Sequence, residues 1–494
     1  MSYVVGIDLG TSAVKVIAVD RTGRVQAEVS RSYPLHHPKS GVSEQNPGDW
    51  VEKTLDALHE LTKEIPASDI DGMSFSGQMH GLVLLDEQYQ PLRPAILWND
   101  TRTTEQCRTI EEQVGKERLL EIAKNPALEG FTLPKLLWVK ENEPDLYEKA
   151  TLFLLPKDYV RYRFTGELYM DYSDAAGTLL MNVSEKTWSD EIASRTGISR
   201  SLCPPLIEST ERVGAFKDGL VEGLTNVSVF AGGADNACGA IGAGILEPGK
   251  TLCSIGTSGV ILSYEEDTDL TVDGKIHYFN HGKANAYYTM GVTLSAGQSL
   301  SWFKEQFAED TPFEELLSDL DDVPAGSNGL LFTPYLSGER SPHADALIRG
   351  SFIGIDASHT RKHLVRSVLE GITFSLNESL AIFRESGKEI DEIVSIGGGA
   401  KNDSWLQMQA DIFNATVTRH ESEEGPALGA AMLAAFGCGW FPTLEACADS
   451  FLKVKKQFTP NDENVKAYHK LFSLYQSVYG QTKELNQKLN EYRI

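Results

Sequence analysis

The sequence predicts an α/β protein whose two similar domains face each other across a cleft. Three observations lead to this prediction. The chain has 494 residues, more than one ordinary hydrophobic core holds. Leu9–Val16 (LGTSAVKV) and Ile255–Leu262 (IGTSGVIL) both read as a strand, a Gly-Thr-Ser bend and a second strand, which indicates an internal duplication. Ala231–Gly244 (AGGADNACGAIGAG) joins a strand-like run to a helix of small residues. We place the two domains at residues 1–245 and 246–494.

The composition excludes several classes of partner. Lys and Arg number 45 against 70 Asp and Glu, and the net charge of −25 argues against nucleic acid or an anionic membrane. The six cysteines form no C-x-x-C pair, which is typical of reduced thiols in the cytoplasm. The first residues lack the basic segment of a signal peptide, and residues 426–441 fall short of the ~20 apolar residues of a membrane span. We therefore expect a cytoplasmic protein.

The N-terminal residues predict an antiparallel hairpin with a glycine bend. Tyr3–Ile7 and Ala13–Val19 read as strands, and Asp8–Ser12 (DLGTS) connects them. A dinucleotide-binding Rossmann motif would lead from a strand into a helix, so this bend indicates a different phosphate-binding class. Val25–Ser32 reads as a third strand, and Asn46 is expected to cap a helix that begins at Pro47.

Two polar loops of the first half are candidates for ligand contact. Gln78-Met79-His80 stands between glycines at the end of a strand, and Trp98–Arg102 (WNDTR) offers groups suited to polyol hydroxyls. The alternative for the first is a connecting turn with a satisfied histidine, and for the second a loop with local hydrogen bonds. Asp171–Leu180 is expected to be a further loop, and Leu246–Lys250 a linker.

In the second half, a helix is expected at about 361–384 and a strand at 390–395. The strand leads into Ile396–Ser404 (IGGGAKNDS), a glycine turn on whose bare backbone an adenosine could lie. The alternative is a strand–helix elbow without a ligand. Pro426–Ala435 predicts a helix that packs very closely, and residues 463–489 predict a final amphipathic helix.

The carboxylates of the glycine stretches carry the chemical prediction. Asp235 is a single acid among small residues, and the alternative to a ligand-facing role is a helix cap. Asp8 precedes the first Gly-Thr-Ser bend by two residues, where the second bend has Ser254. This difference predicts an acid-held metal site on the first domain and a neutral phosphate loop on the second.

Four glycine stretches in this order (GIDLGTS, AGGADNACGAIGAG, SIGTSG and SIGGGAKNDSW) resemble the actin/Hsp70/sugar-kinase ATPase superfamily, and specifically the FGGY carbohydrate kinases. Gly130–Asn142 and Gly350–Glu370 resemble two longer signatures of that family. The resemblance spans about residues 3 to 455. It implies two ribonuclease-H-like domains around a central cleft and transfer of the ATP γ-phosphoryl group to a sugar, with Mg²⁺.

The resemblance also implies roles for individual residues. Asp235 matches the family's catalytic aspartate, whose carboxylate takes the hydroxyl proton. Asp8 would hold Mg²⁺. The sugar would lie against the side chains of Gln78, Met79, His80, Trp98 and Asn236. The phosphates would lie against Gly10, Thr11, Gly256 and Thr257, and the adenosine against Gly398, Gly399 and Asn402. Trp302 lies either near the base or in the core.

Within the family, Tyr33–Trp50 and Leu154–Gly166 most resemble the branch that phosphorylates D-xylulose at O5. The alternatives are kinases of ribulose, gluconate or glycerol, since loop differences set substrate choice. A nucleotide-gated ATPase without kinase activity and a catalytically inactive sensor are two further classes. The family implies a small-molecule sugar as partner, neither nucleic acid nor membrane, and in many members a homodimer.

Overall fold

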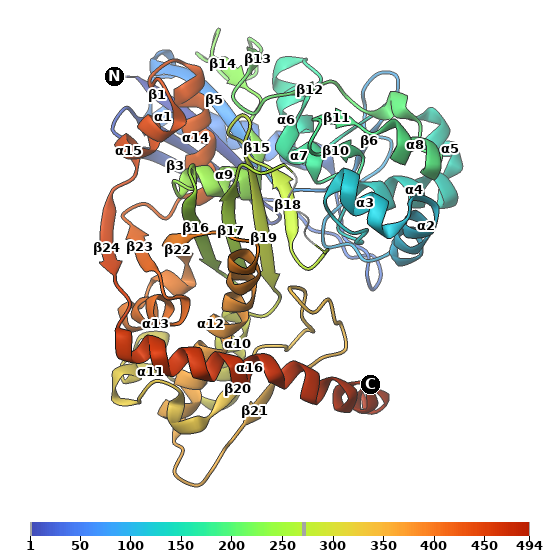
Figure 1. Cartoon of the computed structure of the whole chain (residues 1–494). Helices are drawn as coiled ribbons and strands as arrows, with labels where there is room; N and C mark the ends of the chain where they lie inside the picture. Colours follow the sequence, from blue (N-terminus) through green and yellow to red (C-terminus); the bar gives the residue numbers. More distant parts are fainter. Residues whose placement is uncertain (1, 269–272, 494) are drawn as a thin grey trace.

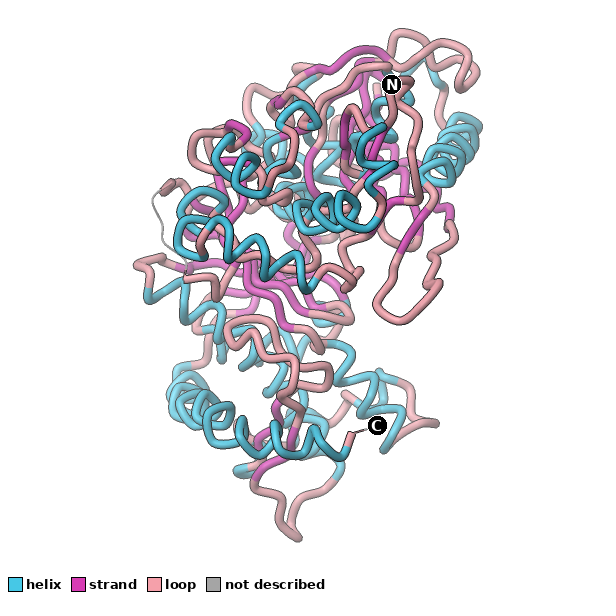
Figure 2. Tube along the Cα trace, turned by 90° about the vertical axis from the view of Figure 1, so that its right-hand side faces the viewer, coloured by secondary structure: helices cyan, strands magenta, loops and turns pink. Residues whose placement is uncertain are grey.

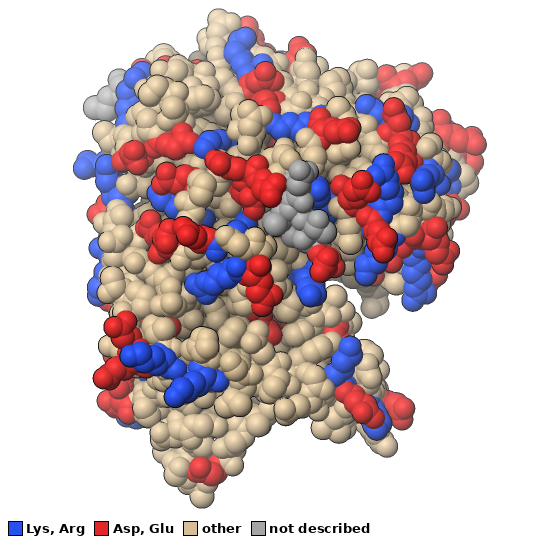
Figure 3. Space-filling view, in the orientation of Figure 1, with Lys and Arg blue, Asp and Glu red and all other residues tan. Residues whose placement is uncertain are grey.

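The structure, a computed structural model, describes residues 2–268 and 273–493 (Figure 1). Two mixed β-sheets form the framework, and the two chain ends lie at opposite ends of the molecule in both views (Figures 1 and 2). On the face shown in Figure 3, acidic and basic side chains are interspersed. Within the described residues, no helix is both long enough and apolar enough to cross a membrane.

The first sheet has the strand order β13-β14-β5-β1-β2-β3. Strand β1 pairs antiparallel with β2 and parallel with β5, and β5 pairs parallel with β14. The expected hairpin is therefore present, with the bend at Gly10–Ser12. The strands are β1 (Tyr3–Leu9), β2 (Ala13–Asp20), β3 (Val25–Ser32), β5 (Ile70–Gly77), β13 (Arg212–Ala215), β14 (Ser228–Phe230) and β15 (Gly233–Ala234), which pairs with β5.

The second sheet repeats this arrangement, with the order β18-β19-β17-β16-β22-β23-β24. Strand β16 pairs antiparallel with β17 and parallel with β22, and β22 pairs parallel with β23. Five successive strands thus have the same order and directions in both halves, which confirms the duplicated fold. The strands are β16 (Gly249–Ile255), β17 (Gly259–Glu265), β18 (His277–Asn280), β19 (Tyr287–Thr293), β22 (Ile390–Gly397), β23 (Thr416–His420) and β24 (Val454–Phe458).

Helices cover the sheets and build a lobe from the residues between β5 and β14 (Figure 1). Asn46 caps α1 through its side chain, as expected. The first half contains α1 (Pro47–Glu64), α2 (Thr104–Val114), α3 (Lys116–Ala123), α4 (Thr132–Asn142), α5 (Pro144–Lys149), α6 (Pro156–Thr165), α7 (Tyr172–Ala176), α8 (Asp190–Thr196) and α9 (Asp235–Gly242). The second half contains α10 (Gly297–Phe307), α11 (Phe313–Leu316), α12 (Arg361–Glu385), α13 (Asp403–Phe413), α14 (Gly425–Gly437), α15 (Leu444–Phe451) and α16 (Asp462–Leu489).

Helices α9 and α14 connect the two halves by packing backbone against backbone. A Cβ added at Gly429 would collide with the carbonyl of Cys238, and one added at Gly242 would collide with the carbonyl of Gly425. Helix α14 also lies on the first sheet, where a Cβ at Gly6 would collide with the carbonyl of Ala427. The expected close packing of this helix is present. It joins residues of the second half to the core of the first.

The structure differs from the sequence prediction at two places. Residues 172–176 of the expected loop form helix α7, because the side chain of Asp171 accepts the Ser173 N–H and caps it. The expected linker ends earlier than predicted, since β16 begins at Gly249. The domain division near residue 245 remains a prediction, because α14 follows it in sequence yet packs on the first sheet.

Candidate functional site

Two cavities meet at the second Gly-Thr-Ser bend. Gly256 and Thr257 line a cavity of about 700 Å³, and the next residue, Ser258, lines a second cavity of about 240 Å³. The smaller cavity also contains Asp235. Two ligands, one in each cavity, would therefore be separated from each other by one bend of the chain. A phosphoryl donor and its acceptor must lie close together in this way.

The carboxyl edge of the first sheet gathers the predicted acids. In the parallel pairing, Asp8 and Gly233 both lie opposite Ser76, so β1, β5 and β15 end side by side. Asp235 begins α9 directly after β15, and the N-cap is Ala234, so the helix-cap alternative for Asp235 is wrong. Its Oδ1 accepts hydrogen bonds from the backbone and side-chain nitrogens of Asn236, at 2.7 and 3.0 Å.

Asp235 has the charge properties of a proton acceptor. Burial and the nearby Asp8 carboxylate raise its pKa to about 7, and the Asn236 amide opposes this shift. Burial also raises the pKa of Asp8, whose Oδ1 is buried without a hydrogen-bond partner in the described part of the chain. Two neighbouring carboxylates with an unpartnered oxygen suit a hard divalent cation such as Mg²⁺.

Lys15 stands beside Asp8 as its partner across the β1–β2 hairpin. Its Nζ lies 2.9 Å from Glu424 and 3.1 Å from Glu28. Sequence reasoning did not select Lys15, although it lies on the strand directly after the first bend. Because Glu424 precedes α14, this ion pair also connects the second half of the chain to the first bend.

His80 presents one defined nitrogen to the smaller cavity. Its Nδ1 lies 2.7 Å from the carbonyl oxygen of Gly177, and a carbonyl only accepts, so Nδ1 carries the proton and Nε2 is an acceptor. Burial lowers the pKa of His80 to about 3, so the ring is neutral. Met79 also lines the cavity, and the Asn236 side-chain nitrogen lies 3.5 Å from its sulfur.

The structure separates Gln78 from the other predicted sugar residues. Gln78 is buried, donates to Gln45 Oε1 at 3.1 Å and is not among the residues that line the cavity. Trp98 lines the cavity and donates from its indole nitrogen to Thr11 Oγ1 at 3.0 Å, which joins the sugar side to the first bend. Asp100 and Arg102, also in the WNDTR loop, pair with each other at 2.7 Å and are therefore engaged away from the cavity.

The glycine amide of each bend donates a hydrogen bond within the bend region, three residues along in the first and two in the second. The Gly10 N–H donates to the Ala13 carbonyl at 3.1 Å, and the Gly256 N–H donates to the Ser258 carbonyl at 2.9 Å. These two amides are therefore used within the bends. The contact of Gly10, Thr11, Gly256 and Thr257 with the phosphates remains a prediction, and its donors would be groups other than these two amides, such as the Thr11 hydroxyl.

The larger cavity contains the residues expected around adenosine. Gly398, Gly399 and Asn402 line it together with Trp405. Asn402 also caps α13 by accepting the Trp405 N–H at 2.9 Å. Trp302 is not among the lining residues; it is half-buried and stacks on Phe332.

The comparisons with known proteins cover the whole chain. Residues 3–242 match the model of the N-terminal domain of the FGGY family of carbohydrate kinases, and residues 251–438 match its C-terminal domain. The chain belongs to the FGGY family of carbohydrate kinases. It is therefore a sugar kinase with the actin/Hsp70-like ATPase fold, and the resemblance identified in the sequence is confirmed.

Relatives of this FGGY kinase differ in how similar they are. The chain is 60% identical to the xylulose kinase of Bacillus subtilis, over 100% of both chains. It is 29% identical to the gluconokinase of the same organism, over 96% of this chain and 95% of that one. The crystal structure of a xyloylose kinase from Brucella ovis has 34% identity, a TM-score of 0.91, and coverage of 97% of this chain and 99% of that one.

In this FGGY kinase, residues of the family-like stretch at 130–142 hold His80 in place. Thr132 Oγ1 and Lys135 Nζ donate to the His80 carbonyl at 3.1 and 3.0 Å. These bonds support the positive φ of 67° at His80, a conformation that non-glycine residues rarely adopt. Burial lowers the pKa of Lys135 to about 7. Sequence reasoning missed this role, although Thr132 and Lys135 were among the residues that carried the resemblance.

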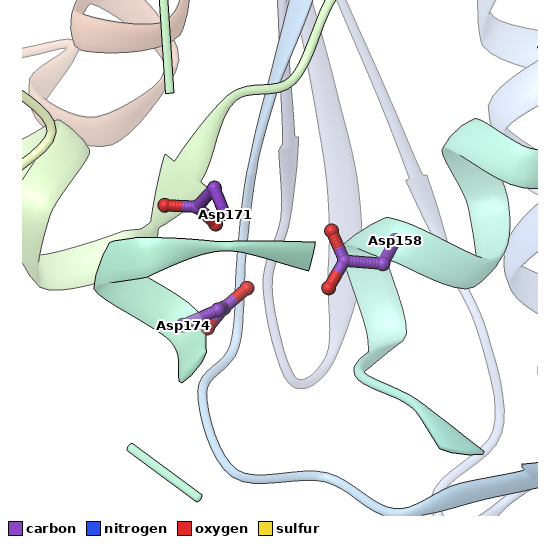
Figure 4. Close-up of side chains that lie close together, drawn as sticks. All are labelled: Asp158, Asp171 and Asp174. Atoms are coloured by element: carbon purple, nitrogen blue, oxygen red, sulfur yellow. The ribbon is translucent and has the colours of Figure 1, made fainter. Parts of the chain in front are cut away.

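A buried cluster of charges surrounds Lys157, at the start of α6. The carboxylates of Asp158, Asp171 and Asp174 point toward one another (Figure 4). Their spacing would suit a metal ion, but Lys157 Nζ lies 2.6, 2.7 and 3.0 Å from them, and Arg161 pairs with Asp158 at 2.8 Å. The pKa of Lys157 is raised overall. Burial alone would lower it, but the three neighbouring carboxylates have the larger effect.

Helix α7 connects this cluster to the carboxyl edge of the first sheet, where Asp235 lies. Asp171 accepts from the Ser173 hydroxyl, and Ser173 Oγ accepts the Ala234 N–H at 2.9 Å, one residue before Asp235. The carbonyl of Gly177, the residue after α7, accepts the hydrogen bond from His80 Nδ1–H. One short helix therefore orients both a predicted sugar-binding residue and the backbone of the predicted base.

Proposed function

We propose that the chain transfers the γ-phosphoryl group of ATP to the O5 hydroxyl of D-xylulose, giving D-xylulose 5-phosphate and ADP. The observation that carries this proposal is the adjacency of the two cavities at Gly256–Ser258, with Asp235 in the smaller one. The 60% identity to a xylulose kinase over the full chain supports the choice of sugar.

Asp235 accepts the proton of the attacking hydroxyl in this proposal. Its pKa of about 7 matches a general base that works near neutral pH. Asn236 and the Nε2 atom of His80 hold other hydroxyls of the sugar, and Met79 packs against its carbon chain. The Asn236 amide fixes the Asp235 carboxylate, so the base is oriented before the sugar arrives.

Asp8 holds Mg²⁺, because its unpartnered buried oxygen offers a ligand beside the phosphoryl-transfer position. When bound, the ion neutralises charge on the phosphate oxygens. Thr11 and Thr257 lie at the corresponding positions of the two bends and supply hydroxyl donors to the phosphates. The adenosine occupies the larger cavity against Gly398, Gly399 and Asn402.

The six cysteines are unpaired, which suits a reducing compartment such as the cytoplasm.

A panel of sugars tests the proposal. The purified protein is incubated with MgATP and D-xylulose, D-ribulose, D-gluconate or glycerol, and ADP release is measured. We expect D-xylulose to give the highest kcat/KM. A higher value with D-gluconate would replace the proposed substrate, and ADP release that no polyol stimulates would favour an ATPase of the same superfamily that is not a kinase.

A further inference from the structure

Arg340 is a cavity residue that neither the sequence reasoning nor the proposed mechanism uses. It belongs to the second half of the chain and lines the smaller cavity together with Asp235 and Asn236 of the first half. Within residues 2–268 and 273–493, no group accepts a hydrogen bond from its guanidinium, and no carboxylate lies within ion-pair distance of it. Arg340 is half-buried and lines the cavity, so its guanidinium is free to donate hydrogen bonds to a ligand there.

The loop that carries Arg340 is fixed on both sides. Glu339 accepts the backbone N–H groups of Leu294 and Arg340 at 3.0 and 2.8 Å. Ser341 exchanges hydrogen bonds with Val292 on β19, at 3.0 Å from its N–H and 3.1 Å to its hydroxyl. The guanidinium is therefore presented to the cavity by a rigid backbone, as a specificity residue requires.

Two neutral histidines accompany Arg340 at this end of the cavity. His277 also lines it, and its Nδ1 lies 3.0 Å from Asn125 Oδ1. The Asn125 amide nitrogen donates to the Tyr278 carbonyl at 2.7 Å, which makes Oδ1 the acceptor and leaves the His277 Nε2 without a proton. His80 likewise offers an acceptor at Nε2. Phe131 contacts both rings, with centroid distances of 4.6 and 6.0 Å.

Arg340 acts electrostatically on the two histidines of the cavity. Arg340 adds to the lowering of the pKa of His80 and His277, for which burial is the main cause. The charge that acts on Asp235 is instead that of Asp8. Glu129 and Glu339 oppose the effect of burial on the pKa of Arg340, so this end is not strongly positive.

We infer that Arg340, with His80 and His277, recognises the α-hydroxyketone end of an open-chain 2-ketose. The guanidinium donates to the C2 carbonyl oxygen, and the two Nε2 atoms accept from the flanking O1 and O3 hydroxyls. A carboxylate fits less well, because it has no protons for the two acceptors and would meet the field of Glu129 and Glu339. This inference rests on the proposed sugar kinase activity and assigns its substrate class.

The test compares D-xylulose with xylitol, in which the carbonyl is a hydroxyl, for the wild type, Arg340→Gln and Arg340→Lys. We expect Arg340→Gln to raise the KM for D-xylulose about ten- to hundredfold, the loss of a charged hydrogen bond. The KM for xylitol should rise less than that for D-xylulose, because its C2 hydroxyl also accepts from Arg340, and the KM for ATP should change little. Arg340→Lys should recover part of the D-xylulose affinity. Arg349→Gln is the control, since Arg349 lies nearby and donates to the carbonyls of Ala346 and Ile348 instead.

A thermal melt separates this role from a structural one. Because the guanidinium has no partner in the described residues, Arg340→Gln should melt at the wild-type temperature or above it. A lower melting temperature, or a fall in kcat with an unchanged preference for D-xylulose over xylitol, would overturn the inference. So would selective loss of D-gluconate turnover. If the wild type phosphorylates none of these sugars, the proposed function fails instead.

Discussion

The Nδ1 atom of His80 lies 2.7 Å from the carbonyl oxygen of Gly177, and this contact fixes which nitrogen of the ring faces the sugar cavity. The backbone of His80 is held independently, because Thr132 and Lys135 donate to its carbonyl. The side chain is therefore positioned before a sugar binds.

His80→Ala should raise the KM for the sugar about tenfold or more, because it removes one acceptor and leaves the Gly177 carbonyl unpaired. His80 should not titrate between pH 5 and 9, since burial lowers its pKa to about 3. Steady-state kinetics check both points, with the exposed His59→Ala as control. An unchanged KM in His80→Ala would contradict the assignment.

Local patterns in the sequence were sufficient for the framework of the site. The repeated Gly-Thr-Ser bends indicated two equivalent hairpins, and the sheets have the same strand order. Small residues at Pro426–Ala435 indicated close packing, which the collision at Gly429 bears out. Each of these features depends on residues that are near one another in the chain, or on a pattern repeated along it.

Asp8→Asn should raise the Mg²⁺ concentration needed for half-maximal activity by about tenfold or more, since an anionic oxygen ligand is lost. Activity is titrated with Mg²⁺ at fixed total ATP, and Mg²⁺ binding to the ADP-bound protein is measured separately. The exposed Asp56→Asn, on α1, is the control. The same Mg²⁺ dependence in Asp8→Asn and the wild type would remove Asp8 from the metal site.

Lys157→Met should destabilise the fold by more than about 3 kcal/mol, because three buried carboxylates lose their shared cation. Urea unfolding measures the change in the free energy of unfolding. Lys53→Met, at an exposed ion pair on α1, should change it by less than about 0.5 kcal/mol. If Lys157→Met unfolds at the wild-type urea concentration, the cluster is not neutralised by this lysine.

Gly429→Ala should destabilise the protein by about 1–3 kcal/mol, since its Cβ would strike the Cys238 carbonyl across the α9–α14 contact. Gly480→Ala is the matched control. No atom lies within 4 Å of a Cβ added there, on the exposed side of α16, so stability should rise by about 0.5–1 kcal/mol. Equal melting temperatures for the two variants would show that the contact tolerates a side chain.

The parts that sequence reasoning missed depend on contacts between distant segments. Arg340 lies more than a hundred residues from Asp235 in the sequence, and no spacing rule connects them. Gln78 stands beside Met79 and His80 in the sequence yet donates to Gln45, a residue from a distant segment. In the sequence, Lys157 looks like an ordinary lysine of a helix. Its ion pairs with Asp171 and Asp174, at the start of and within α7, appear only in the fold.

The raised pKa of Asp235 gives a stability prediction that requires no substrate. Above about pH 7 the Asp235 carboxylate is ionised in the folded protein, although burial and the charge of Asp8 disfavour the ionised form. This lowers the free energy of unfolding, because the unfolded chain ionises the same group without that cost. The cost disappears as the pH falls toward the ordinary Asp pKa of 3.8. In EDTA without nucleotide, Asp235→Asn should therefore raise the melting temperature more at about pH 8 than at about pH 5.5. An equal effect at both values would contradict the raised pKa.

The activity of Asp235→Asn with MgATP and D-xylulose tests the proposed mechanism most directly. The amide cannot accept the O5 proton, so kcat should fall by about a hundredfold or more while ATP binding, measured by calorimetry, stays at the wild-type affinity. A kcat within about threefold of the wild type would show that Asp235 is not the base.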